Sequence, residues 1–514
     1  EARAYNTQTY GDVMVNINKT FGDDWSLNAN IGASINNIKT DELSYRGPIQ
    51  ENGLPNVFNV FDLDDTKKRA EKTGWHDQTQ SLFASVEVGW KQMLYLTVTG
   101  RNDWASQLAN SPSSSFFYPS VGLSWVPTST WDLGEALSYL KIRGSIASVG
   151  MPFPRHLTIP TYEYDATNRV WKDKTHYPIG DLKPERTTTY EVGLDARLWQ
   201  RISLSASWYQ ADTKNQTFDP SLPPSSSYTT IYLQTGHVRN TGVELSAGYD
   251  NQWRDFRWAT NFTYSWNRNE IIELAANAVN PVTGEPLNLN KLDIKGLGKA
   301  KYILKEGGTL GDLYTTSDLR FNDNGYIEVD KNGNLLLTDE GDDIYLGSVF
   351  PDHNLAWRND FSWKGINLGV LFTARIGGIC YSATQANMDL YGVSEASAAA
   401  RDAGGVWING RELVDAQKWY QAIGSQSGLP QYYTYSATNI RLQELSLGYT
   451  LPAKWFRDKM RMTVSFVGRN LWMIYCKAPF DPEAVASTGL NYQGIDYFMM
   501  PSLRSLGFNV KFQF

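Results

Sequence analysis

The 514-residue sequence contains few of the residues on which disulfide-rich and metal-dependent folds rely. Its two cysteines, Cys380 and Cys476, exclude a disulfide scaffold, and neither lies in a CxxC motif. Its five histidines are scattered, and no GxSxG, HExxH or Gly-rich phosphate-binding motif occurs. We therefore predict no enzymatic activity, no cofactor and no bound metal.

Long hydrophobic runs and an excess of positive charge are also missing. No stretch approaches the ~18 consecutive apolar residues of a transmembrane helix. The formal net charge is -7 and there is no basic stripe, so nucleic-acid binding is not expected. The chain starts at Glu1 without the charged and apolar regions of a signal peptide, so we expect a processed chain or a fragment.

Glycine and aromatic residues are abundant instead, with Gly 42, Tyr 29, Phe 21 and Trp 18. Apolar residues make up only 41%, and the mean hydropathy is -0.41. This composition favours strands and turns over a helical core.

Period-2 alternation of apolar and polar residues is the dominant pattern, as in 81–90, 202–209 and 506–514. Successive strand side chains point to opposite faces, so each such segment has one apolar and one polar face. Segments of about ten or more residues are long enough to cross a bilayer as tilted strands. About fifteen segments qualify, at 9–21, 25–36, 78–90, 93–103, 116–126, 139–149, 186–198, 200–211, 238–250, 255–268, 353–363, 366–377, 437–451, 460–474 and 501–514.

The connections between these segments alternate strictly between short and long. The long ones lie near 37–77, 104–115, 150–185, 212–237, 269–352, 378–436 and 475–500. Short turns at one rim and long loops at the other are typical of an outer-membrane barrel, and a soluble sandwich has no reason to sort its loops this way. We predict an all-β, transmembrane antiparallel β-barrel with long extracellular loops and short periplasmic turns.

The count of fifteen predicted strands, together with the alternation of short and long connections, constrains the rest of the chain. The alternation requires that 269–352 hold no membrane strand or two, so Lys301–Lys305 is expected in a folded loop or dipping into the lumen. Single-chain bacterial barrels have an even strand number with both ends periplasmic. An open fifteen-stranded sheet would leave two unpaired edges in lipid, which is prohibitively costly. We therefore expect residues 1–514 to be the C-terminal part of a larger barrel.

Two local details follow from the same register. The apolar face changes parity within Ile440–Leu451, which predicts a β-bulge near Gln443–Glu444. Cys380 and Cys476 follow strands that flank a third, about 9.6 Å apart. A disulfide needs Cα atoms within about 7 Å, so none is expected.

Several motifs resemble one known family. The segment Ser436–Pro452 reads SATNIRLQELSLGYTLP and closely resembles the strand-and-turn signature of SusC/RagA-type TonB-dependent transporters of the Bacteroidetes outer membrane. Further segments are similar to that family's strands and loops from about residue 75 onward. They are Arg101–Ser106, Phe117–Val121, Leu182–Arg186, Tyr190–Leu194, Asn240–Glu244, Gly468–Trp472, Phe480–Glu483 and Pro501–Phe512.

The resemblance implies a 22-stranded barrel with an N-terminal plug domain and a TonB-engaging segment before it. About fifteen strands here leave about seven strands and the plug outside this chain. It also implies active import of oligosaccharide or oligopeptide across the outer membrane of a Gram-negative bacterium. The implied partners are a SusD-like surface lipoprotein, TonB-ExbB-ExbD acting through the plug, outer-membrane lipid and a second transporter–lipoprotein pair. A passive porin and a surface adhesin remain the alternatives.

Aromatic residues form three predicted groups. Phe508, Val510, Phe512 and Phe514 match the C-terminal signal read by barrel-assembly machinery, although any amphipathic strand can end in phenylalanine. Strand-end rings are predicted to form interfacial girdles: Trp25, Trp90, Tyr118, Trp125, Trp199, Trp253, Trp363 and Trp455. Loop rings are candidate cargo contacts, with packing inside folded loops as the alternative: Tyr162, Tyr164, Trp171, Tyr177, Trp407, Trp419, Tyr420, Tyr432, Tyr433 and Tyr435.

Two acidic loop segments, Asp318–Gly325 and Asp339–Asp343, contain carboxylates of the kind that bind calcium. Neither has the EF-hand spacing with its closing glutamate. They are predicted to be solvated turns.

Overall fold

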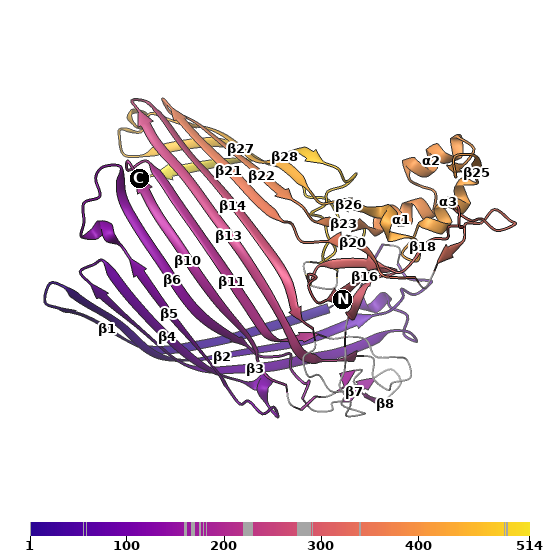
Figure 1. Cartoon of the computed structure of the whole chain (residues 1–514), viewed down its shortest axis with the longest axis horizontal. Helices are drawn as coiled ribbons and strands as arrows, with labels where there is room; N and C mark the ends of the chain where they lie inside the picture. The colour runs from indigo at the N-terminus through magenta and orange to yellow at the C-terminus, as the bar shows by residue number, and fades with distance from the viewer. Residues whose placement is uncertain are drawn as a thin grey trace.

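The computed structural model describes residues 2–54, 56–57, 59–158, 162–165, 170–173, 176–177, 179–180, 182–218, 230–274, 289, 291–338, 341–487, 489 and 492–514. Within these residues the chain forms one large curved wall of strands, with folded loops gathered at one end (Figure 1). In the described part of the chain, no helix combines the length and apolarity needed to cross a membrane.

The wall is a fifteen-stranded antiparallel sheet in which each strand pairs with its neighbours in chain order. All fifteen predicted segments are present. Its strands are β1 (Ala2–Phe21), β2 (Trp25–Arg46), β3 (Arg69–Trp90), β4 (Leu94–Ala105), β5 (Phe116–Trp125), β6 (Leu137–Met151), β10 (Glu185–Leu198), β11 (Ile202–Phe218), β13 (Leu233–Trp253), β14 (Phe256–Glu273), β21 (His353–Trp363), β22 (Ile366–Ile376), β27 (Asn439–Thr450), β28 (Arg461–Cys476) and β30 (Ser505–Gln513).

The strands near the N-terminus are longer than their apolar pattern predicts. The loop expected at 37–77 is mostly a β2–β3 ribbon, whose ladder continues through Thr40–Trp75 to Arg46–Arg69. This expectation was wrong because the apolar alternation stops at about Ile38, whereas the backbone hydrogen bonds do not need apolar side chains.

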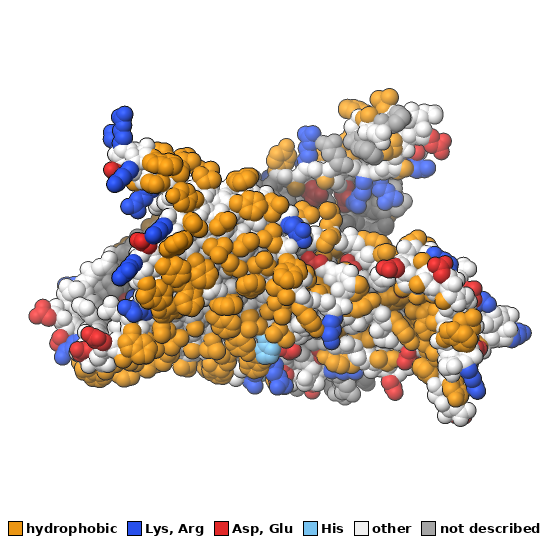
Figure 2. All heavy atoms as spheres, turned by 90° about the horizontal axis from the view of Figure 1, so that it is seen from above, with side chains coloured by type: hydrophobic (Ala, Val, Ile, Leu, Met, Phe, Trp, Pro, Cys, Tyr) orange, Lys and Arg blue, Asp and Glu red, His pale blue; other side chains and the backbone are white. Residues whose placement is uncertain are grey.

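The two faces of the wall differ as the alternation predicts. Along β11, Leu204 and Trp208 point outward, while Ser205 and Ser207 lie on the opposite, inner face. Hydrophobic side chains gather on the outer surface of the wall (Figure 2). The two edge strands of the sheet order are β1 and β30, and the described residues contain no pairing between them.

The turns at the short-loop rim are tight. Lys364 and Gly365 join β21 to β22 with φ of 47° and 92°, and Lys91 and Gln92 also have positive φ. Two consecutive left-handed residues match the right-handed twist of the flanking strands.

Three register predictions are confirmed. Gln443 is skipped in both ladders of β27, so the bulge lies where it was expected. Lys301–Lys305 belongs to β16 (Ala300–Lys305), outside the wall, in a separate sheet with β15 (Lys291–Leu297), β17 (Asp312–Thr315) and β20 (Ile344–Ser348). The two cysteines are free, and their strands β22 and β28 flank β27.

The girdle prediction needs one correction. Tyr118 lies on the inner face, where its hydroxyl donates to Asp103 Oδ2 (2.6 Å) beside Arg101. Its ring has the opposite parity from the outward Phe117 and Trp125. Position at a strand end is therefore insufficient, because the pleat decides which face a ring occupies.

The remaining elements lie in the long loops, except for the 3₁₀ turns Pro127–Ser129 and Ala453–Phe456, which lie in connections at the short-loop rim. The strands are β7 (Tyr162–Asp165), β8 (Val170–Asp173), β9 (His176–Tyr177), β12 (Thr230–Ile231), β18 (Asp318–Leu319), β19 (Leu337–Thr338), β23 (Ile379–Ser382), β24 (Val406–Ile408), β25 (Glu412–Val414), β26 (Thr434–Ser436) and β29 (Ile495–Asp496). The helices are α1 (Ala383–Leu390), α2 (Glu395–Asp402) and α3 (Ala416–Ile423), with 3₁₀ turns at Val60–Asp62, Ser106–Leu108, Pro127–Ser129, Pro430–Tyr433 and Ala453–Phe456.

Candidate functional site: the loop core and the inner face of the wall

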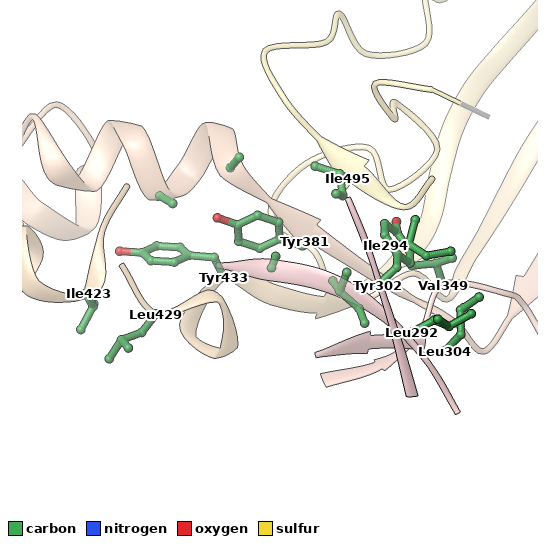
Figure 3. Close-up of a cluster of buried hydrophobic side chains, with 14 of the residues drawn as sticks. Leu292, Ile294, Tyr302, Leu304, Val349, Tyr381, Ile423, Leu429, Tyr433 and Ile495 are labelled. Atoms are coloured by element: carbon green, nitrogen blue, oxygen red, sulfur yellow. The ribbon is translucent and has the colours of Figure 1, made fainter. Parts of the chain in front are cut away.

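Three long loops, with part of a fourth, fold together at one end of the wall and share a hydrophobic cluster, here called the loop core. It joins the described parts of 274–352, 377–438 and 477–504, and the 212–237 connection adds Phe218, Ile231 and Leu233. Figure 3 shows Leu292, Tyr302 and Val349 on one side of the cluster and Tyr433 with Leu429 on the other, with Tyr381 between them. The cluster also includes Val238 and Ile271, inner-face residues of β13 and β14. The loop core is therefore attached to the lumenal side of the wall.

Short β-pairings tie the second of these loops to the third. β23 pairs antiparallel with β26 and parallel with β29, which joins the second loop to the third. The buried Ser382 hydroxyl donates to Asp496 Oδ2 (2.6 Å) and also caps α1 by accepting from Gln385 N. Such a bonded, buried core gives the loops a fixed shape rather than independent positions.

Buried tyrosines form the polar part of the loop core. The Tyr302 hydroxyl donates to the Gln493 carbonyl, and the Tyr433 hydroxyl donates to Asp389 Oδ2 (2.9 Å). Burial raises the pKa of both phenols, and at Tyr433 the Asp389 carboxylate raises it further. Both tyrosines therefore stay neutral donors at physiological pH.

An ion pair anchors the third loop to the wall. Arg441 on β27 donates to both carboxylate oxygens of Asp481, at 2.5 and 3.3 Å, and to Asn439 Oδ1 (2.8 Å). Burial opposes ionisation of Asp481, but the bonds from Arg441 and Ser502 outweigh it and lower its pKa to about 2. Both residues belong to the motifs quoted above, yet the sequence offered no sign that they meet.

Charged residues on the inner face are paired across strands. Arg143 on β6 donates to Glu191 (3.1 Å) and Asp195 (2.7 Å) of β10. Gly193 lies between those two acids, and a Cβ there would stand 2.6 Å from Arg143 Cζ. The missing side chain is thus what lets the guanidinium lie flat over β10.

A second inner-face network crosses four strands. Arg358 donates to Asp360 (2.9 Å) and Glu444 (3.2 Å), and Arg469 donates to the other oxygen of Glu444 (3.1 Å). Paired charges and hydroxyls give the lumen a wetted surface on which polar solutes can form hydrogen bonds.

The first group of predicted cargo contacts lies on a projecting hairpin, β7–β8. The rings of Tyr164 and Trp171 contact one another with centroids 5.1 Å apart, and they are 48% and 69% exposed. Tyr162 is also exposed. Tyr177 lies in β9, and its side chain lies outside the described residues.

The second predicted group divides between surface and core. Trp407, on the β24–β25 hairpin, is 66% exposed, whereas Tyr433 is buried in the loop core. Of the remaining rings, Tyr432 is exposed, whereas Trp419, Tyr420 and Tyr435 are partly buried. Trp419 meets Tyr432 edge-on (centroids 6.0 Å), Tyr435 meets Phe480 (5.6 Å), and Trp419 and Tyr420 pack against the loop core.

Acidic side chains of both segments are engaged by donors of the protein itself. Asp343 pairs with Lys291 (3.0 Å) and Lys305 (2.9 Å), while Asp318 Oδ1 accepts from the Gln431 amide (2.9 Å). Asp339 lies outside the described residues. Among the residues that are described, no group of three His, Cys, Asp or Glu side chains is placed to hold a metal.

The fold and inner face define a membrane-spanning β-barrel wall that carries a folded extracellular loop assembly. The family model for "TonB dependent receptor-like, beta-barrel" matches residues 2–371, so the chain belongs to this family, whose members are outer-membrane proteins.

Two relatives confirm the resemblance inferred from the motifs. The TonB-dependent receptor P3 of Formosa agariphila is 24% identical over 98% of this chain and 52% of its own length. The TonB-dependent receptor SusC of Bacteroides thetaiotaomicron is 21% identical over 65% of this chain and 32% of its own. The chain spans about half the length of the first curated relatives it matches.

Solved structures agree on the fold. A chain of the RagAB peptide transporter superposes with a TM-score of 0.71 at 19% identity, covering 99% of this chain and 55% of that one. The "open-open" state of the RagAB peptide importer gives a TM-score of 0.73 at 17% identity.

Proposed function

We propose that this chain forms most of the wall and much of the extracellular vestibule of an active nutrient importer in a Gram-negative outer membrane. The cargo is an oligosaccharide or an oligopeptide, moved by TonB with energy from the proton-motive force. The observation that carries the proposal is the loop core, a rigid assembly attached to the charged inner face of a TonB-dependent receptor barrel. A passive porin would not need such an assembly of folded loops.

The remaining strands and the plug are supplied by the part of the receptor outside this chain. Two open sheet edges, β1 and β30, support this arrangement, because unpaired edges in lipid leave backbone groups without partners. Denaturing intact-mass analysis of the native complex, with N-terminal sequencing of every chain, tests it. A receptor or companion fragment carrying plug-like sequence is expected, and a closed barrel of this chain alone would contradict it.

Cargo is captured between this vestibule and a SusD-like surface lipoprotein, in a dimer of transporter–lipoprotein pairs. TonB-ExbB-ExbD acts through the plug. The relation to SusC and to the RagAB peptide transporter supports the lipoprotein partner. The exposed rings of Tyr162, Tyr164, Trp171 and Trp407 are the best placed of the predicted aromatics to contact cargo.

The last strand also serves assembly. Phe508, Val510, Phe512 and Phe514 are exposed, and along β30 the first three share the outward parity of Val464 on β28. We assign them the role of the C-terminal signal for barrel assembly in the outer membrane.

Conductance across a planar bilayer separates active import from a passive porin. The purified full-length receptor is expected to pass no steady current, because a plug fills the lumen. A stable open conductance of the intact receptor would favour the porin instead.

A further inference from the structure

Cations gather on the outward face of the wall, at the long-loop end of β10, β11, β13 and β14. The pleat places Arg186, Lys214, Arg239 and Arg268 on the same face as the apolar outward residues of those strands. From Phe256 to Arg268, β14 climbs about 31 Å at ~3.4 Å per residue and a ~40° tilt. The apolar band of an outer-membrane barrel is about 25 Å tall, so these cations lie at the level of the outer headgroups.

Two of the cations stand directly opposite each other. Arg186 and Lys214 are cross-strand partners on one face, an arrangement in which like charges repel. Arg186 turns away from Lys214, with Nε donating to Ser148 Oγ (2.7 Å) and Nη2 to the Phe117 carbonyl (3.4 Å). Both side chains are exposed.

No described carboxylate neutralises this pair. In the described part of the chain, neither Arg186 nor Lys214 forms an ion pair within 4.0 Å. The nearest acid on this face in sequence, Asp212, accepts instead from His237 Nε2 and Arg239 Nε, both at 2.8 Å. Among the described residues, these two adjacent positive charges therefore face outward without an ion-pair partner.

The feature is local to these strands. At the corresponding ends of β22 and β27, the outward positions hold the apolar Ile376 and Ile440. The general need for solubility above the bilayer therefore does not explain a pair of facing cations on β10 and β11.

We propose that Arg186 and Lys214 bind the phosphate of a lipid headgroup in the outer leaflet. Phosphate brings the missing negative charge, and several acceptor oxygens can bridge both cations. The apolar band begins directly below the pair, with Tyr190 and Trp208 on the same face of the same strands, so acyl chains can lie along it while the phosphate stays between the cations. A free phosphate ion could also bind the two cations, but it has no acyl chains to contact the apolar band below them.

The test titrates fluorescent bis-phosphorylated lipid A into the full-length receptor in detergent. An anionic contact near a membrane is worth about fivefold in affinity per cation, so R186Q/K214Q should raise the apparent Kd about thirtyfold and K214Q alone about fivefold. R254Q, which removes a cation from the β13–β14 turn at the opposite rim, should leave the Kd unchanged. Heat-modifiable migration on gels checks that every variant is folded.

Lipid A stripped of its phosphates should bind the wild type as weakly as the phosphorylated form binds the double variant. Equal affinity of wild type and double variant, or strong binding of the stripped lipid, would overturn the proposal. Complete displacement of lipid A by an equimolar amount of inorganic phosphate would identify a free-ion site and overturn the lipid assignment.

Discussion

The buried pair of Arg441 and Asp481 can be broken by one substitution, R441M. Their side chains are 3% and 9% exposed, so the change removes a buried cation and leaves its carboxylate uncompensated. Breaking a buried pair from one side costs about 3–5 kcal/mol. Asp481 retains the bonds from the Ser502 and Glu483 amides, which places the expected loss near the lower value, about 3 kcal/mol.

The loss should appear as local opening rather than as global unfolding. Arg441 and Asp481 connect the wall to the 477–504 loop, whereas the β27 ladder does not depend on them. Hydrogen exchange of amides in 477–504 should accelerate about 100-fold in R441M. Amides of β21 and β22 act as an internal control and should not change.

A double variant separates charge from packing. In R441M/D481L neither charge remains, so exchange should return most of the way to that of the wild type. Unchanged exchange in R441M, or equal acceleration in R441M and the double variant, would refute the view that this ion pair holds the loop.

Three further predictions follow from the same contacts. The pKa of Asp481 is lowered to about 2, so its contribution to loop stability is present above about pH 4 and lost as the pH falls through about 2; exchange in 477–504 should rise over that range, and a flat profile would contradict it. G193A should lower the temperature of the heat-modifiable transition, because its Cβ would strike Arg143. G144A should not, because the nearest atom to its Cβ would be the Glu191 carbonyl oxygen, at 3.8 Å. W407A should weaken cargo binding without changing exchange of the loop core; unchanged cargo affinity would remove Trp407 as a contact.

The sequence predicted the wall well because each strand is apolar on one face. Period-2 alternation located all fifteen strands, and the change of parity in 440–451 located the bulge at Gln443. The prediction of strand length failed where a strand has no alternating apolar residues. The upper parts of β2 and β3 are mostly polar and lack apolar alternation, and their ladder became visible only in the structure.

The loop core could not be predicted from the same pattern. Most of its members come from segments without periodicity, such as Tyr302 and Tyr433, which share one cluster across more than a hundred residues of sequence. Arg441 and Asp481 are likewise brought together by the strand register and the bulge, not by proximity along the chain. For Tyr118 the predicted position at a strand end is correct, but its ring lies on the inner face and not in the interfacial girdle.

Energy-dependent uptake tests the central claim most directly. Cells expressing the full-length receptor would be given labelled oligopeptides and oligosaccharides, with and without a protonophore, and in parallel in a strain lacking TonB. One cargo class should accumulate only in energised, TonB-containing cells, and receptor deletion should abolish it. Accumulation that persists without TonB and without the proton-motive force would contradict active import and favour a passive channel.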